Sequence, residues 1–168
     1  MSWNDAIAYC EWLSKKHSRT FRLPTEAEWE YACRAGTTTP FNTGENITTT
    51  DQANYNGDFP YSNNKKGVWR KNTVAVDSLK PNKWGLYNMH GNVWEWCDDV
   101  YSIISYDECK AKGFVENPGG PVPETGSCRV IRGGGWGSSA EYCRSACRPD
   151  DAPDRRNDTV GFRLVFVP

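Results

Sequence analysis

The side chains best suited to chemistry lie in the last forty residues, between two short apolar runs. Val130–Ile131 and Leu164–Val167 have the apolar, partly β-branched composition that is typical of strands. The residues between these runs have almost no aliphatic side chains and are rich in Arg, Asp, Ser and Gly. A long polar segment held between two strands is a common form of binding or catalytic loop. The sequence therefore predicts such a loop, and other residues must decide between binding and catalysis.

Thiols are the second group of side chains that could be reactive or bind a metal. The chain contains no CxxC pair and only two histidines, so a structural zinc site is not expected. Cys10 and Cys97 lie among aromatic residues and are predicted to be free, buried thiols. Cys109 and Cys128 bracket a Gly/Pro-rich loop and could pair in an oxidising compartment. The seven cysteines are Cys10, Cys33, Cys97, Cys109, Cys128, Cys143 and Cys147.

Oxygen ligands gather around a tight turn before a predicted strand. Asn88 and Glu95 flank this turn, and the backbone carbonyls of Gly91 and Val93 could point in the same direction. Calcium prefers such a mixture of carboxylate, amide and carbonyl oxygens. The alternative is ordinary turn capping, which is more common for an Asn-turn-Glu pattern. His90, inside the turn, is expected to be a packed or hydrogen-bonded side chain and not a ligand.

Length and composition favour a single domain. A chain of 168 residues can bury about two-thirds of its surface without metals or disulfides. The net charge of −1, from 20 basic and 21 acidic residues, gives no support for a nucleic-acid partner. No apolar run approaches the ~18 residues that a membrane span needs. Eight Trp, eight Tyr and six Phe predict a core of large flat rings, and Tyr55, Phe59, Tyr61 and Trp69 are expected to be buried there.

Two helices near the N-terminus should provide scaffold for the loop. Ser2 opens a capping box for a helix to about Lys16, and Thr25 opens another for a helix that Gly36 ends. Short strands are predicted at 73–76 and 93–97, and long irregular segments at 37–82 and 98–128.

Four separated motifs resemble the formylglycine-generating enzyme (sulfatase-modifying factor) family. They are Leu23–Glu30, Gly85–Trp96, Arg129–Gly134 and Gly161–Arg163, and they occur in order over nearly the whole chain. The resemblance implies an α+β variant of the C-type lectin fold, with two helices, small twisted antiparallel sheets and much irregular coil, in one domain over 1–168. It also implies that Asn88, Gly91, Val93 and Glu95 could hold a structural calcium ion. No other cofactor is expected to be required.

The enzyme branch of this family oxidises a cysteine in a sulfatase peptide with two copper-binding cysteines. A soft metal needs thiolates at a fixed separation. The matching positions here are Ser138 and Cys143, and Cys147 stands at the wrong place in the loop to restore the pair. The prediction is therefore that the chain is not an enzyme, with a copper-dependent oxidase as the alternative.

The region 133–160 is more similar to the variable region of treponemal proteins that retroelements diversify. In those proteins randomised asparagine codons alter ligand-binding positions within a fixed frame. Trp136, Arg144, Arg148 and Arg156 belong to the frame predicted here. Each position between frame residues holds a residue that such a codon can become. The predicted ligand-binding residues are Gly137, Ser138, Ser139, Tyr142, Cys147, Pro149, Asp150, Asp151, Ala152, Arg155, Asp158 and Thr159.

This resemblance implies a non-enzymatic display protein on a bacterial surface, attached through an N-terminal lipid anchor that lies outside this chain. Its ligand, unknown from the sequence, is expected to be a protein or a cell-surface molecule. A sugar-binding lectin is a third alternative by analogy of fold. The absence of a Glu-Pro-Asn or Gln-Pro-Asp motif makes that alternative weaker.

Overall fold

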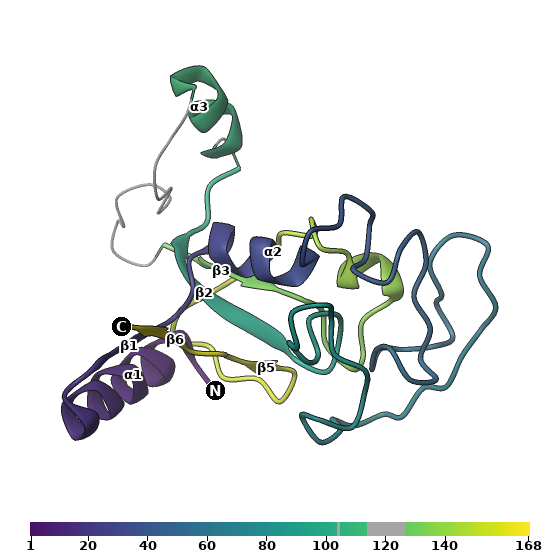
Figure 1. Ribbon diagram of the computed structural model, residues 1–168, viewed down its shortest axis with the longest axis horizontal. Helices are drawn as coiled ribbons and strands as arrows, with labels where there is room; N and C mark the ends of the chain where they lie inside the picture. Colours follow the sequence, from purple (N-terminus) through teal and green to yellow (C-terminus); the bar gives the residue numbers. More distant parts are fainter. Residues whose placement is uncertain (104, 114–126) are drawn as a thin grey trace. The chain divides into compact units, whose positions relative to one another are not determined.

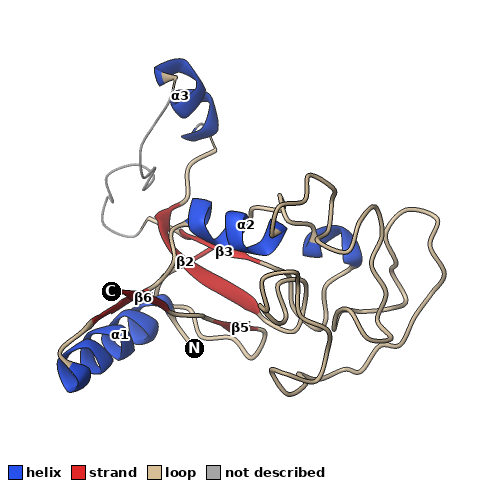
Figure 2. Cartoon of the chain, in the orientation of Figure 1, coloured by secondary structure: helices blue, strands red, loops and turns tan. Residues whose placement is uncertain are grey.

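The helices and strands of the computed structural model are short, and loops carry most of the chain (Figure 2). The structure describes residues 1–103, 105–113 and 127–168. The elements are α1 (Trp3–His17), β1 (Thr20–Arg22), α2 (Glu26–Arg34), β2 (Trp94–Val100), α3 (Ser105–Lys112), β3 (Arg129–Arg132), a 3-10 turn η1 (Ala140–Cys143), β4 (Asp150–Asp151), β5 (Val160–Gly161) and β6 (Val165–Val167). The contacts divide the chain into a first unit (Met1–Trp29, Trp96–Ile131 and Arg148–Pro168) and a second unit (Glu30–Glu95 and Arg132–Cys147).

Both predicted capping boxes are present. The Ser2 hydroxyl accepts the backbone N–H of Asp5, and the Asp5 carboxylate accepts the N–H of Ser2, so α1 begins with two of its free N–H groups satisfied. Thr25 and Glu28 form the same reciprocal pair at the start of α2. α2 ends where Ala35 and Gly36 take positive φ angles of 45° and 88°.

Two small sheets are present, a two-stranded ribbon in the first unit and a four-stranded sheet of which most residues belong to that unit (Figure 1). β1 pairs with β6 in a two-stranded ribbon, with Phe21 opposite Phe166, and α1 packs against β1. A four-stranded sheet has the order β4-β3-β2-β5. In it Arg129 lies opposite Asp151 and Val130 opposite Asp150, so the predicted loop returns to pair with the strand that precedes it.

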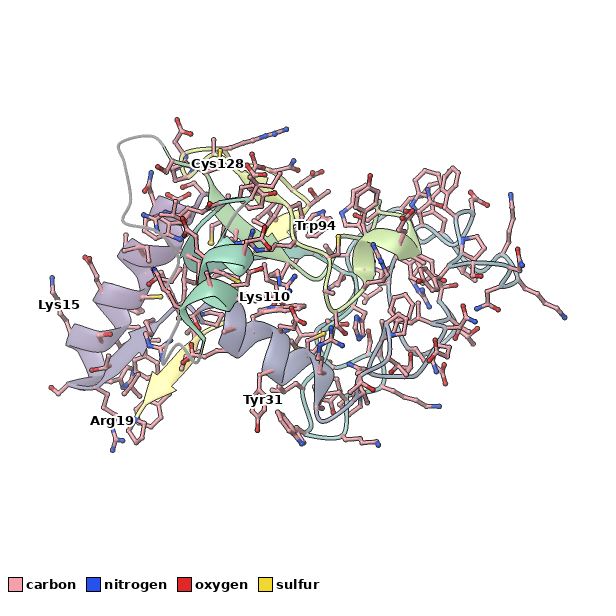
Figure 3. All side chains as sticks on the ribbon, turned by 90° about the horizontal axis from the view of Figure 1, so that it is seen from above. Lys15, Arg19, Tyr31, Trp94, Lys110 and Cys128 are labelled. Carbon is pink, nitrogen blue, oxygen red and sulfur yellow. The ribbon has the colours of Figure 1, made fainter. Side chains whose placement is uncertain are left out.

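The second unit is mostly coil around a small core. Its buried cluster consists of Phe41, Ile47, Ala53, Tyr55, Ala140 and Cys143, with Tyr61 packed against it. The ring of Tyr61 meets Phe41 edge-on, with centroids 5.1 Å apart. Tyr31 on α2 is 70% exposed and projects away from the helix (Figure 3).

The prediction of an α+β fold with short helices, small antiparallel sheets and much coil is confirmed. A third helix, α3, falls in the segment 98–128 that was expected to be irregular, while 104 and 114–126 lie outside the described residues. The prediction of a single domain over 1–168, with a variable region at about 133–160, stays a prediction. Among the described helices, none is both long and apolar enough to cross a membrane.

Two further predictions are wrong. Residues 73–76 do not form a strand, because asparagine side chains take the place of a neighbouring strand: Asn92 accepts the N–H of Val74, and Asn88 donates to the carbonyl of Val76. Cys109 and Cys128 are free thiols, as are the other five cysteines. A hydrogen bond to the Asp150 carboxylate and burial raise the pKa of Cys128.

Candidate functional site

A hollow lined by aromatic rings lies in the second unit. It has a volume of about 470 Å³. Phe59 and Tyr142 are 60% and 54% exposed, although rings of this size are normally largely buried. Trp94, labelled in Figure 3, adds the third ring from the start of β2. The lining residues are Phe59, Trp94, Gly137, Ser138, Ser139 and Tyr142.

A second hollow of about 610 Å³ adjoins the aromatic one, since both are lined by Phe59 and Ser139. Its distinguishing feature is a pair of carboxylates, Asp58 and Glu141, on exposed residues. Among the ion pairs and side-chain hydrogen bonds of the described residues, neither carboxylate takes part. Its lining residues are Asp58, Phe59, Pro60, Tyr61, Ser62, Ser139 and Glu141. The two hollows together are called the groove below.

Backbone hydrogen bonds hold the two walls of the groove together. The N–H of Ala140 donates to the carbonyl of Phe59 at 3.0 Å, and the N–H of Asn56 donates to the carbonyl of Ser138 at 2.9 Å. Asn56 also fixes the turn that follows it, because its side-chain oxygen accepts the N–H of Asp58. The wall residues are therefore positioned by main-chain groups, which remain available with any side chain except for the N–H that proline lacks.

A buried histidine contacts the backbone at the end of η1, next to the groove. His90 is 3% exposed, its Nδ1 lies 2.7 Å from the carbonyl of Cys143, and its Nε2 accepts the N–H of Asn42. These partners fit a neutral ring that carries its proton on Nδ1. Burial lowers the pKa of His90 to about 4, against a smaller raising effect of the Cys143 carbonyl. His90 is thus a hydrogen-bonded core residue within the turn.

A buried arginine fixes the two ends of the loop 132–147. Arg132 is fully buried, and its guanidinium donates to the carboxylate of Glu30 on α2 and to the carbonyl of Cys147. Glu30 also accepts a hydrogen bond from Arg34 at 2.8 Å. One guanidinium therefore ties the start of the loop to its end and to the helix.

The predicted binding residues divide between the two units. Gly137, Ser138, Ser139 and Tyr142 lie together along the aromatic hollow, and Cys147 is half-buried in the same unit. The other seven belong to the first unit, where β4 and the turns after it contain them: Pro149, Asp150, Asp151, Ala152, Arg155, Asp158 and Thr159.

The predicted frame arginines each have a fixed partner. Arg144 donates to the carbonyl of Glu141 at 2.9 Å. Arg148 donates to the Glu26 carboxylate at 2.7 Å, and Arg156 forms two bonds with Asp5 at 2.9 and 2.7 Å. The carboxylate partners are thus on α1 and α2, and Glu141 contributes its backbone.

Sequence reasoning missed the side of the groove that precedes the loop. Phe59 was expected in the core, and Asp58 and Trp94 were not considered as binding residues. Glu141 is not among the predicted binding residues, yet its carboxylate lines the second hollow. An available signal was the Asn56-Gly57-Asp58-Phe59-Pro60 stretch, because Asn, Gly, Asp and Pro favour a turn that leaves the intervening ring at the surface.

The thiols do not fit the copper pair of the enzyme branch. Ser138 stands at the first position, and its hydroxyl accepts the N–H of Gly135 at 3.1 Å. Cys143, at the second, is fully buried and packs its sulfur against the carbonyl of Ser139. Burial raises the pKa of the Cys143 thiol, which opposes the thiolate that copper binding requires. One thiol and one hydroxyl at the two matching positions are a poor donor set for a soft ion.

The predicted calcium residues fit a hard cation better. The side-chain oxygen of Asn88 is buried and has no hydrogen-bond partner, and Asn88 and Glu95 are 9% and 5% exposed. Asn88 and Gly91 take φ angles of 52° and 85°, which place them in the tight turn expected from the sequence. An orphaned buried oxygen calls for an explanation, and a bound ion supplies one. In the described part of the chain no three His, Cys, Asp or Glu side chains converge on a metal site.

Comparisons with known proteins agree with this architecture. Residues 1–167 match the sulfatase-modifying factor enzyme 1-like domain. The formylglycine-generating enzyme of Mus musculus is 41% identical over 173 residues, a match that covers 98% of this chain and 42% of the mouse protein. PvdO from Pseudomonas aeruginosa superposes with a TM-score of 0.75 at 33% identity, covering 99% of this chain and 60% of that one. Treponema denticola variable protein 1 superposes with a TM-score of 0.72 at 27% identity, covering 98% of this chain and 68% of that one.

The chain therefore belongs to the sulfatase-modifying factor family and has the fold of its formylglycine-generating enzyme-like members. It spans less than half the length of the mouse relative. The family includes enzymes, and a treponemal variable protein is among the structural neighbours.

Proposed function

We propose that this chain is a non-enzymatic ligand-binding protein whose groove is diversified by a retroelement and displayed on a bacterial surface. The observation that carries the proposal is the aromatic hollow, because four of the predicted variable positions line it together. The likeness to Treponema denticola variable protein 1 supports the same reading. A lipid anchor would attach the protein to the surface.

A diversified surface needs a backbone that does not depend on the exchanged side chains. Main-chain bonds between Asn56 and Ser138 and between Phe59 and Ala140 meet this need. His90 and Arg132, which support the loop, are not variable positions. Gly137 and Tyr142 are exposed and make no side-chain hydrogen bond in the described chain that the fold would lose on substitution. Ser138 is the exception, since its hydroxyl accepts the N–H of Gly135.

The alternative is a copper-dependent oxidase, which the identity to formylglycine-generating enzymes favours. Such an enzyme needs a second thiolate beside Cys143, and this chain has Ser138 there. The decisive assay measures Cu(I) binding and oxygen-dependent oxidation of a cysteine-containing sulfatase peptide. We expect neither above background for the parent chain. Tight Cu(I) binding by the parent with turnover of the peptide would establish the oxidase instead.

Ser138→Cys is the matched control for this assay. It places a thiol in the groove wall close to Cys143, so a gain of Cu(I) affinity in this variant would show that the assay detects the pair. The display role is tested separately by grafting residues 137, 138, 139 and 142 into a sibling scaffold. The specificity of binding to a cell-surface extract should follow the graft, and retention of the recipient's specificity would contradict the proposal.

Calcium is proposed as a structural ion in the second unit. Asn88 and Glu95 would supply side-chain oxygens, and Gly91 and Val93 would supply carbonyls. A divalent cation there would partner the orphaned Asn88 oxygen and the buried acidic residue Glu95. The ion would stabilise the turn that leads into β2 and would take no part in ligand chemistry.

A further inference from the structure

We propose that residues 65–71 of the second unit, called the basic loop below, dock on a membrane surface rich in anionic phospholipids. The basic loop is coil and lies outside the lining of the groove (Figure 2). It combines exposed cations with an exposed Trp and an exposed Val. The inference therefore concerns a second surface of the chain and does not depend on the binding role proposed above.

The charge of the basic loop has a single sign. Between Asp58 and Asp77 the chain contains four basic residues and no acidic one, although its overall net charge is −1. Lys65, Lys66 and Lys71 are exposed, and within the described chain none of them takes part in an ion pair. A local excess of cations is attracted to an anionic lipid surface over about one Debye length, whatever the net charge of the whole chain.

Apolar side chains are exposed beside these cations. Trp69, which was expected in the core, is 36% exposed, and Val68 is 57% exposed. The Lys71 ammonium lies 4.9 Å from the centroid of the Trp69 ring, so one cation and the ring share a side of the loop. At a bilayer the lysines would meet lipid phosphates, the indole would lie at the level of the headgroups and the valine would leave water.

The backbone of the basic loop is fixed to the rest of the second unit. The N–H of Gly67 donates to the carbonyl of Gly57 at 2.8 Å, and the N–H of Val68 donates to the hydroxyl of Thr49 at 2.6 Å. Arg70 points its guanidinium inward and donates to the carbonyl of Thr49 at 2.6 Å. The exposed side chains are therefore presented by an ordered backbone, and docking costs little conformational entropy there.

The exposed valine favours lipid over other polyanions. Nucleic acids and sulfated polysaccharides would also attract the lysines, and a base could stack on the Trp69 ring. Neither of them offers an apolar environment to Val68, whereas the boundary between headgroups and acyl chains does. Membrane docking is thus the role that uses the cations, the ring and the aliphatic side chain together.

The test measures binding of the chain to vesicles by co-sedimentation. One set of vesicles is phosphatidylcholine alone, and in the other about a third of the lipid is phosphatidylglycerol, which supplies the negative surface potential. We expect binding to the anionic vesicles only. It should weaken when the salt concentration rises from about 0.1 M to about 1 M, because the Debye length falls from about 10 Å to about 3 Å.

A charge variant assigns this binding to the basic loop. It carries Lys65→Gln, Lys66→Gln and Lys71→Gln. Each lysine near an anionic surface contributes about fivefold to binding, so the variant should bind about a hundredfold more weakly. The matched control makes the same change of net charge at three exposed lysines elsewhere in the chain and should lose much less affinity. It carries Lys15→Gln, Lys83→Gln and Lys110→Gln.

An apolar variant separates lipid from other polyanions. Val68→Ser with Trp69→Ser should weaken binding to anionic vesicles by about tenfold, because less apolar surface leaves water. It should leave any binding to dextran sulfate unchanged. Ile103→Ser with Trp84→Ser is the matched control, since these side chains are 82% and 47% exposed outside the basic loop, and it should bind vesicles like the parent. Thermal unfolding of each variant checks its fold.

The inference is overturned if the parent does not bind anionic vesicles, or if the charge variant and its control lose equal affinity. It is also overturned if the charge variant loses binding to vesicles and to dextran sulfate while the apolar variant loses neither, because the basic loop would then be a general polyanion site. None of these results bears on the groove, whose binding role the loop graft tests separately.

Discussion

The two parts of the predicted variable region are held in different ways. Residues 133–147 belong to the second unit, where the fully buried Arg132, the buried His90 and main-chain bonds to residues 56–59 support them. Residues 148–160 belong to the first unit. There the β4–β3 pairing holds the chain together with ion pairs that range from the largely buried Arg148–Glu26 pair to the exposed Arg156–Asp5 pair.

The two segments differ in whether the side chains that stabilise the backbone are also the predicted binding side chains. In residues 133–147 the stabilising groups are buried and lie away from the exposed positions, so the rings and carboxylates at the surface are free to meet a ligand. In residues 148–160 several predicted binding side chains also hold the local structure: Asp151 accepts hydrogen bonds from Arg155 and from its neighbour Ala152. Exchange of side chains should therefore be tolerated better at 137 and 142 than at 151.

The largest effect is expected from the buried arginine. Arg132→Met removes the bonds to Glu30 and to the carbonyl of Cys147 and leaves both acceptors partly unsatisfied in the interior. Breaking a buried ion pair from one side typically costs about 3 to 5 kcal/mol of unfolding free energy. Chemical denaturation of the parent and the variant measures this loss. Arg156→Met, at an exposed pair, is the matched control.

A loss equal to that of the control would mean that Arg132 is not the anchor of the loop. The double variant Glu30→Met with Arg132→Met sharpens the result, because removing both charges avoids an unpaired carboxylate. It should recover part of the stability lost in the single variant.

The next effect is a pH dependence that His90 imposes on the second unit. Its folded pKa of about 4 lies below the ordinary 6.5, because burial disfavours the charged ring. The stability that this group contributes is present above pH 6.5 and is lost as the pH falls from there through 4. A shift of this size corresponds to about 3 kcal/mol when the pH is below both pKa values.

Unfolding free energies measured between pH 4 and pH 7 for the parent and for His90→Gln isolate this contribution. The variant should be less stable at pH 7, and its stability should change less on acidification. Asp99 opposes the trend in both proteins: burial raises its pKa to about 6, so its contribution is lost as the pH rises from 3.8 through 6. Subtracting one profile from the other removes Asp99, and parallel profiles would show that His90 does not titrate as expected.

What could be predicted from the sequence depends on whether the contacts involved are local or distant. Capping boxes are local, so Ser2–Asp5 and Thr25–Glu28 were predictable from spacing alone. The aromatic lining of the groove was not predictable, because Phe59 and Trp94 reach the groove through contacts between distant segments. An isolated Phe in a sequence does not indicate whether its ring will be buried or exposed. The predicted strand at 73–76 failed for a related reason: its β-branched residues suit a strand, but distant asparagines satisfied its backbone.

A smaller effect is expected from calcium. If Asn88 and Glu95 hold the ion, adding calcium to chelator-treated protein should raise the unfolding midpoint by several degrees, on the order of 5 °C at a hundredfold excess over Kd. Asn88→Gly removes the orphaned oxygen and keeps the positive φ of 52° accessible. The variant should lose the calcium-dependent rise, whatever its own midpoint. An equal rise in the variant would place the ion elsewhere, and an equal rise with magnesium in place of calcium would show that the site is not specific for calcium.

The smallest effect is expected at the pair between Arg156 and Asp5. The side chain of Arg156 is 72% exposed, so water and salt screen the attraction and the two bonds should contribute little to folding. Hydrogen bonds from Arg156 hold the pKa of Asp5 well below its usual value, with smaller help from Ser2. Arg156→Gln should leave the unfolding midpoint within the scatter of replicates at neutral pH, yet raise the pKa of Asp5 in an NMR titration of its carboxylate. The Ser2 capping box remains in the variant, so the pKa should stay below the usual range of an aspartate. A clear drop of the midpoint would mean that residues 148–160 depend on this contact as residues 133–147 depend on Arg132, and the distinction between a buried and an exposed anchor would then fail.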